Sequence, residues 1–288
     1  MHLGYVDFRR QWSPASWLGG WCVRILAQTT FFALIGQLLG SPLKVEYLLV
    51  GNSIMVGCEA ALLAAQATTW ERFDGTYPLL VVAPASMLPS VVGRTSAWLI
   101  DGMATAVIAF YAAALIFRLP LTPVVALEVL PLIVLTCISA YCLALFLGAL
   151  VSLKPSLRNM VSQVMRLSMM AICGVNVPVT FWPLVVQVIA NVLPVTHGVQ
   201  AVRLALSGTP PVAVLTSALL EVVVAAGWLL VALVSFNGIV ERGPNRRLDR
   251  AGLGGERSRG SFRWANAGMP AELGLQPGHQ RRRFPGIG

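Results

Sequence analysis

Charge is scarce in this chain. Only 11% of its 288 residues are Asp, Glu, Lys or Arg, and the mean hydropathy is +0.73. Soluble domains carry about a quarter charged residues, so this composition excludes an ordinary water-exposed globular surface. Apolar runs of roughly 20 residues, the length needed to cross a bilayer, recur along the sequence. The sequence therefore predicts a polytopic membrane protein.

Lysine is scarce as well, and no two cysteines have the spacing of a metal-binding or redox motif. The only lysines are Lys44 and Lys154, and neither follows a glycine, so the chain has no G-x-x-x-x-G-K-[ST] nucleotide loop. The five cysteines lie in apolar runs without a C-x-x-C, which argues against a disulfide framework or a metal site. No G-x-S-x-G elbow is present. We therefore expect no catalytic residue, no metal, no cofactor and no enzymatic activity in this chain.

The apolar runs predict an all-α fold with six transmembrane helices. Aromatic residues on one face of residues 5–12 predict a short interfacial helix at the N-terminus. The pieces 181–194 and 196–208 are too short to span and predict a re-entrant helical pair before the last span. The six spans are expected at about 21–40, 46–67, 95–117, 123–151, 160–180 and 211–236.

The basic residues predict the orientation. With both termini in the cytoplasm, the outer loops hold only Lys44, Arg118 and Arg203, and the inner flanks hold more, as the positive-inside rule requires. Residues 1–240 would form the transmembrane domain.

The composition changes after this domain. Residues 241–288 contain ten arginines and four acids and predict a disordered, basic cytoplasmic tail. This tail is either simply solvated or in contact with anionic membrane lipids. Nucleic acid is not an expected partner, because the tail is not a folded basic module.

A charged segment interrupts the apolar pattern between the second and third spans. Glu71, Arg72 and Asp74 fall within four positions and are followed by Gly75. On the expected topology this loop, residues 68–86, lies in the cytoplasm. Without further information its charges would simply mark the membrane boundary.

The outer region before the last span has its own pattern. Pro183 follows a tryptophan, and the stretch Leu-Pro-Val-Thr-His places Pro194 and His197 three positions apart, with Arg203 downstream. Irregular backbone at membrane depth is tolerated only where protein or a water-filled cavity covers it. We therefore expect this pair to cover something at the outer face.

In order and spacing these elements resemble the permease subunit of type-2 ABC exporters. The likeness covers residues 1–240 and includes the ERFDGT stretch at 71–76, the outer motifs, and the six-span order with its interfacial helix. Phe73 and Asp74 depart from the family, where these positions are often charged and polar. The resemblance implies a bacterial plasma-membrane protein that docks an ATP-binding ABC subunit through loop 68–86 and pairs with a second permease copy.

The mechanism follows from the same resemblance: ATP would be hydrolysed in the partner, and this chain would form an export pathway. The spans are rich in Val, Leu and Ala with few aromatic residues, which favours a hydrophobic or amphipathic substrate such as a drug, an antibiotic or a lipid over a long polar glycan. The alternative is a secondary transporter driven by an ion gradient. In that case the intramembrane acids Glu59, Asp101 or Glu221 would carry the ions.

Arg166 is the basic residue well inside the fifth span. An intramembrane arginine usually has a partner or a wet cavity, and Glu59 and Asp101 lie at similar expected depths. Polar residues at helical spacing, including Gln163 and Asn176, place Arg166 on a polar stripe. We expect Arg166 to pair with Asp101 or Glu59 at the cytoplasmic mouth of the pathway. The competing interpretation is that its long side chain reaches the inner head groups unaided.

Overall fold

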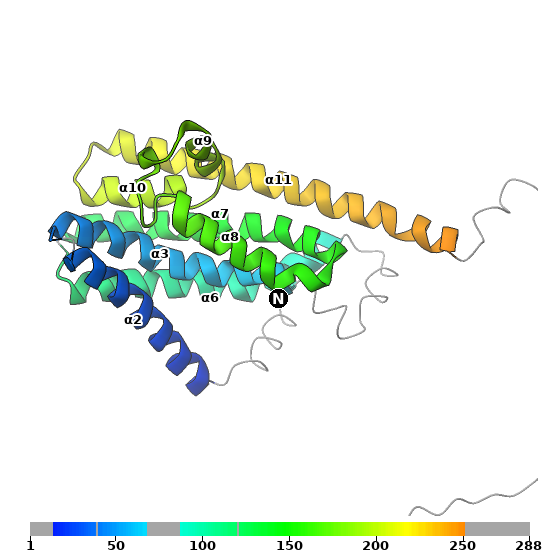
Figure 1. The fold of residues 1–288 in the computed structure, drawn as a ribbon, viewed down its shortest axis with the longest axis horizontal. Coiled ribbons are helices and arrows are strands. Elements are labelled where there is room, and N and C mark those ends of the chain that lie inside the picture. Colours follow the sequence, from blue (N-terminus) through cyan, green and yellow to red (C-terminus); the bar gives the residue numbers. More distant parts are fainter. Residues whose placement is uncertain (1–13, 39, 68–86, 120, 251–288) are drawn as a thin grey trace, which may run out of the picture. The chain divides into compact units, whose positions relative to one another are not determined.

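The computed structural model describes residues 14–38, 40–67, 87–119 and 121–250, and every regular element in these ranges is a helix (Figure 1). The all-α class is confirmed for this part of the chain. The expected interfacial helix at 5–12, the loop 68–86 and the tail beyond residue 250 lie outside the described residues. The elements are α2 (Pro14–Leu38), α3 (Pro42–Ala67), α6 (Met87–Ile116), α7 (Pro123–Leu153), η1 (Pro155–Leu157), α8 (Arg158–Ile172), η2 (Val179–Phe181), α9 (Leu184–Val192), α10 (Thr196–Leu206) and α11 (Pro211–Arg250).

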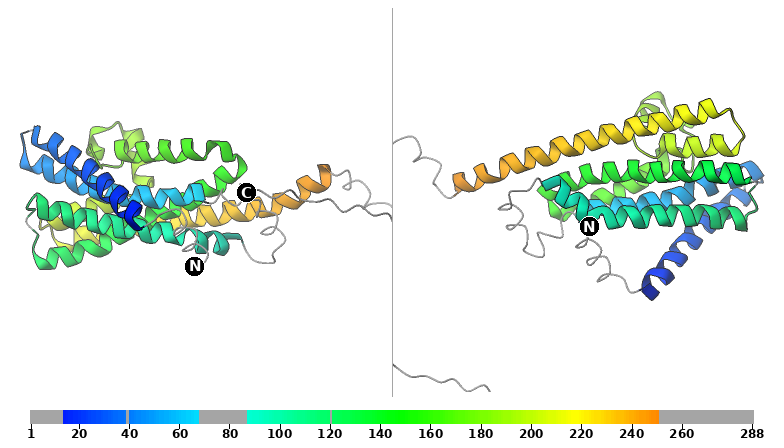
Figure 2. Two further views of the ribbon diagram at one scale, coloured as in Figure 1. Left: turned by 90° about the horizontal axis from the view of Figure 1, so that it is seen from below. Right: turned by 180° about the vertical axis from the view of Figure 1, so that it is seen from behind.

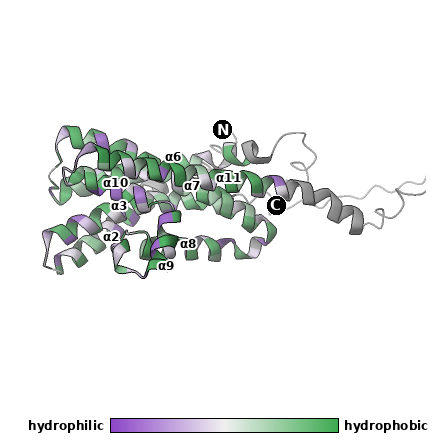
Figure 3. Cartoon of the chain, turned by 90° about the horizontal axis from the view of Figure 1, so that it is seen from above, coloured by the Kyte–Doolittle hydropathy of each residue, from purple (hydrophilic) through white to green (hydrophobic). Residues whose placement is uncertain are grey.

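Four of these helices are long and apolar enough to cross a membrane: Pro42–Gln66, Thr95–Ile116, Pro123–Leu153 and Pro211–Gly238. They agree within a few residues with four of the six expected spans. Hydrophobic residues cover most of their length in Figure 3. The pair α9 and α10 passes the same test only when it is taken together, with a bend of 89° between the two helices. The described residues therefore contain four such helices, or five if the bent pair counts as one span.

The other two expected spans are not among these four. α2 (Pro14–Leu38) covers most of the expected span 21–40, and Val23–Leu38 is its apolar stretch. The expected span 160–180 is not one helix, because α8 ends at Ile172 after 15 residues, about 22 Å at 1.5 Å per residue. Gly174 then takes a φ of 78°, in the left-handed region that a helix cannot continue through.

At the other end of the chain, α11 runs further than expected. The tail was predicted to be disordered from residue 241, but residues 241–250 are helical. Extending a helix that already exists avoids the cost of nucleation. The arginines and Leu248 are good helix formers, whereas Gly243 and Pro244 in the same segment oppose a helix. A boundary placed by composition alone therefore falls inside this helix.

α3 is the central helix, and α2, α6, α7 and α8 all pack on it (Figure 1). Small residues bring α3 and α6 together. A Cβ on Gly57 would lie 2.4 Å from Gly102 O and 2.4 Å from Ala106 Cβ, so the two backbones nearly touch. Gly57 and Ala61 on α3 face Gly102 and Ala106 on α6, each pair four residues apart. This is the small-xxx-small packing by which helices associate in membranes.

The bent pair is built at a proline. Pro194 follows α9 and cannot donate a helical hydrogen bond. The next residue, Val195, has a φ of 84°, which a β-branched residue rarely adopts. α10 then runs against α7, where a Cβ on Gly198 would overlap the side chain of Thr136. The reversal of the chain between α8 and α11 can be followed in the views of Figure 2.

Candidate functional site

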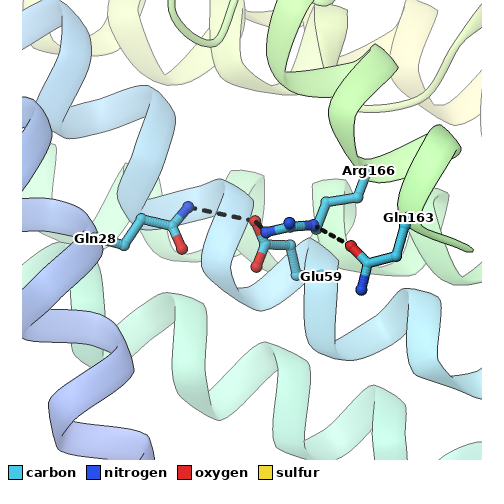
Figure 4. Close-up of polar contacts among 4 residues, drawn as sticks. All are labelled: Gln28, Glu59, Gln163 and Arg166. Atoms are coloured by element: carbon cyan, nitrogen blue, oxygen red, sulfur yellow. Dashed lines mark hydrogen bonds and ion pairs between the residues drawn. The ribbon is translucent and has the colours of Figure 1, made fainter.

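The carboxylate of Glu59 on α3 is the meeting point of three helices. Glu59 is only 9% exposed. Its Oε1 atom accepts a hydrogen bond from Gln28 Nε2 on α2 at 3.3 Å and lies 3.5 Å from Arg166 Nη1 on α8. Arg166 Nε donates to Gln163 Oε1 at 3.0 Å. Figure 4 shows Gln28 approaching Glu59 from one side and Arg166 with Gln163 from the other.

The sequence of α8 explains how Arg166 reaches this position. Gln163 and Arg166 are three residues apart and share one helix face, which is the face turned toward Glu59. Met160, Val164 and Leu167 lie on another face and are 65%, 52% and 57% exposed. Gln163 is exposed, whereas Arg166 turns inward toward Glu59. The exposed apolar side chains on the other face suit a helix in contact with lipid.

The charges around Glu59 are unequal. Arg24 on α2 acts on this carboxylate in addition to Arg166, so one negative charge lies near two positive charges. Arg24 Nε is buried and has no hydrogen-bond partner in the described part of the chain. The contacts of Glu59 with Gln28 and Arg166 use the same oxygen and are long for charge-assisted hydrogen bonds. The arrangement is therefore one whose partners can exchange when α2, α3 and α8 move.

A second polar group, around Arg203 on α10, ties this helix to α3 and to the segment after α8. Its guanidinium donates to Gly174 O at 2.7 Å, Val175 O at 3.1 Å and Tyr47 O at 2.8 Å. The same guanidinium stacks 3.3 Å from the centre of the Tyr47 ring. Three backbone carbonyls and an aromatic face thus solvate this cation, which anchors the end of the bent pair.

A third group holds the start of α10. Glu221 on α11 is fully buried, and its two oxygens accept from Val195 N at 3.0 Å and Gly198 N at 2.9 Å. A carboxylate at a helix N-terminus is favourable, because the free amides and the helix dipole both attract it. Both oxygens accept from backbone N–H donors, so the carboxylate joins α11 to the start of α10. The geometry therefore supports a structural role for Glu221.

The remaining predicted residues lie at the following places. Pro183 directly precedes α9, and Pro194 separates α9 from α10. His197 lies in the first turn of α10, with Nε2 3.1 Å from Asn191 O. Asp101 is half-buried on α6. The four loop residues Glu71, Arg72, Asp74 and Gly75 lie outside the described residues.

Of the two acids expected near Arg166, the structure shows Glu59 in contact with it. Sequence reasoning missed Gln28 as a member of this group. The available signal was an amide within the first expected span, which contains Gln37 as a second one. The hydrogen bonds between Glu221 and the start of α10 were also missed. Their donors are backbone amides, which every residue other than proline has, so the sequence does not identify them.

Comparisons of the chain with protein-family models, with curated proteins and with solved structures give no match. The functional proposal therefore depends on the residues, their geometry and the resemblance of the motifs.

Proposed function

We propose that this chain is the transmembrane subunit of an ATP-driven ABC exporter for a hydrophobic or amphipathic substrate. A separate ATP-binding subunit would dock on the loop 68–86, and a second permease copy would complete the pathway. The proposal includes six crossings with both termini in the cytoplasm. α2 and α8, each with the segment that follows it, would supply the two crossings beyond the four long apolar helices.

The observation that carries the proposal is the Glu59–Arg166 ion pair. It joins α3 to α8 inside a group of helices whose outward side chains are largely apolar. Charges within a membrane protein are costly and usually mark a pathway or a moving part. The pair is long and Arg166 is 36% exposed, so Arg166 can move away with α8 and stay partly solvated, while Arg24 on α2 still acts on the buried Glu59 carboxylate. Such a pair suits a transporter that alternates between two arrangements.

The bent pair supports the same proposal from another part of the chain. A broken helical pair before the last span is what the resemblance to type-2 exporters implies, and α9 and α10 form a bent pair directly before α11. Glu221 holds the bend between the two helices, and Arg203 holds the last turns of α10. The pair would cover the outer end of the pathway.

The proposal is tested by asking whether an ATPase binds the charged loop. The chain would be co-expressed with a Walker-motif ATPase encoded in a neighbouring reading frame, purified and reconstituted. We expect the ATPase to co-purify, and Glu71→Ala combined with Arg72→Ala to reduce both co-purification and ATP hydrolysis. Lys154→Ala changes an exposed charge at the turn between α7 and α8 and serves as the matched control. Equal coupling in the double variant and the wild type would count against docking at this loop.

The alternative is a secondary transporter, and the burial of Glu59 is the observation that favours it. A buried carboxylate beside two arginines can take up and release an ion as the helices move. Vesicles separate the two functions. An exporter requires ATP and its ATPase and works without an ion gradient, whereas a secondary transporter works with a proton or sodium gradient alone.

A further inference from the structure

A cavity of about 480 Å³ lies at one end of the helices, away from the Glu59 group. It is formed by the turn between α2 and α3 and by the turn that follows α6. Its volume falls in the range of about 300–1,000 Å³ typical of ligand pockets. The functional proposal does not use this cavity, and nothing in the inference below depends on that proposal.

Two opposite charges line the cavity. Glu46 comes from the first turns of α3, and Arg118 comes from the turn after α6. Within the described part of the chain neither side chain makes an ion pair or a hydrogen bond. Gln37 from α2 adds an amide to the lining. The cavity thus offers one acceptor for a cation, one planar donor for an anion, and no net charge.

The backbone around Arg118 is unusual. Its φ is 53°, in the left-handed region that residues other than glycine rarely occupy. Strained backbone of this kind occurs often at binding sites, where the surrounding structure holds a side chain in a required position. Together with two unpartnered charges on one cavity, this points to a ligand.

The position of the cavity limits what the ligand can be. The candidate span on α3 begins at Pro42 and the span on α6 ends at Ile116, so the lining residues 40–43, 45, 46 and 117–119 lie where apolar helices leave the membrane. Lipid head groups occupy this level of a bilayer. Leu43 on the lining is 77% exposed, and the nearby Leu38 is 87% exposed. Acyl chains would find apolar surface beside the charged pocket.

We propose that this cavity binds the zwitterionic head group of a phospholipid, with its phosphate on Arg118 and its ammonium group on Glu46. A guanidinium fork matches phosphate oxygens, and a carboxylate attracts an ammonium ion. An anionic head group would satisfy Arg118 but would be repelled by Glu46. Because the charges of Glu46 and Arg118 sum to zero, the cavity favours a head group that also carries one positive and one negative charge. Small soluble zwitterions can carry the same phosphate and ammonium groups. The exposed leucines beside the cavity favour a lipid over such a soluble molecule, because they can contact its acyl chains.

The test uses the purified full chain, stripped of lipid in detergent, with bound lipid counted by native mass spectrometry. Phosphatidylethanolamine and phosphatidylglycerol with identical acyl chains are the two probes, and glycerophosphoethanolamine is the soluble head-group probe. We expect the wild type to retain phosphatidylethanolamine in preference to phosphatidylglycerol, and not to retain the soluble probe. Equal retention of both lipids would overturn the zwitterion assignment. Retention of the soluble probe as tightly as the lipid would overturn the lipid assignment.

Three variants with thermal unfolding matched to the wild type locate the site. Arg118→Gln should weaken retention of both lipids about tenfold, as expected for the loss of a charge-assisted hydrogen bond. Glu46→Gln should reverse the preference toward phosphatidylglycerol, because it removes the repulsion of the anion. Lys44→Gln changes an exposed charge in the same turn that does not line the cavity, and should have no effect. If Lys44→Gln weakens binding as much as Arg118→Gln, the interaction is general surface attraction and the proposal is wrong.

Discussion

Among single residues, Arg166 and Glu59 form the ion pair on which the proposed transport cycle depends. The Glu59 carboxylate is buried on α3. The Arg166 guanidinium on α8 is 36% exposed and contacts this carboxylate at 3.5 Å. Gln28 and Gln163 occupy further positions around the pair. If the pair joins the two helices in only one state of a transport cycle, its charges should be exchangeable between the partners.

The first prediction is a charge exchange. Arg166→Glu places two carboxylates together and should abolish transport, because like charges at this distance repel in a medium of low dielectric constant. Adding Glu59→Arg restores opposite charges in reversed positions and should recover part of the activity. Substrate transport in vesicles, compared at equal amounts of inserted protein, provides the measurement.

The matched control for this exchange uses Glu128, an exposed acid on α7. Arg166→Glu combined with Glu128→Arg has the same net charge as the exchanged pair, yet should remain inactive. A normally active Arg166→Leu variant would show that the pair is dispensable and that Arg166 simply reaches the head groups.

The sequence predicts that Arg166 has an acidic partner, but not which acid it is. An arginine in an apolar run needs a partner, and counting residues along the helices gave two acids at similar depth. The choice between Glu59 and Asp101 depends on which helix α8 packs against, and short apolar runs do not specify that. Gln28 could not be assigned for the same reason, because its role depends on α2 packing beside Glu59 on α3.

Between helices, the closest packing joins α3 and α6 through Gly57 and Gly102. In a membrane, apolar side chains gain little by leaving lipid, so close approach of small residues drives much of the association. The pattern Gly57-x-x-x-Ala61 can be read in the sequence, but it marks an interface only once a partner pattern is found on another helix. The structure supplies this partner as Gly102 and Ala106.

The second prediction compares two glycines in apolar helices. Gly57→Ala should destabilise the protein, since the added methyl group would meet backbone atoms of α6 at 2.4 Å and force the helices apart; overpacking of this kind costs about 1–3 kcal/mol. Gly227→Ala on α11 meets nothing within 4 Å and should be neutral or stabilising by up to about 1 kcal/mol through helix propensity. Thermal unfolding in detergent measures both, and equal effects would contradict the packing argument.

Helix ends were the elements that sequence patterns predicted least well. The expected fifth span continued to residue 180, because its composition stays apolar past Gly174. The structure ends α8 at Ile172, since the carbonyls of Gly174 and Val175 bind Arg203 instead of continuing the helix. Gly174, the residue after the C-cap, is a local signal for this helix end, and the contact with a residue some thirty positions downstream adds information that local sequence does not contain.

At the scale of the whole molecule, two topologies differ in whether α9 and α10 cross the membrane. Four helices are long and apolar enough. The six-span proposal adds α2 and α8 and treats α9 and α10 as a pair that enters and leaves on the same side. If α9 and α10 instead cross as one broken span, the ends of the pair lie on opposite sides. The two topologies therefore place the turn before α9 and the turn after α10 on the same side or on opposite sides of the membrane.

The third prediction locates those turns with single cysteines. Ser156, Thr180 and Ser207 are exposed and lie before α8, before α9 and after α10. Cys58, Cys137, Cys142 and Cys173 are buried, so only Cys22 needs replacement by serine to limit background labelling. On the proposed topology, an impermeant maleimide added to intact cells should label Thr180→Cys and Ser207→Cys, whereas Ser156→Cys should react only after permeabilisation. Labelling of Thr180→Cys with protection of Ser207→Cys would mean that the bent pair crosses the membrane. Positions 156 and 180 on one side would mean that α8 does not cross, and the six-span proposal would then be wrong.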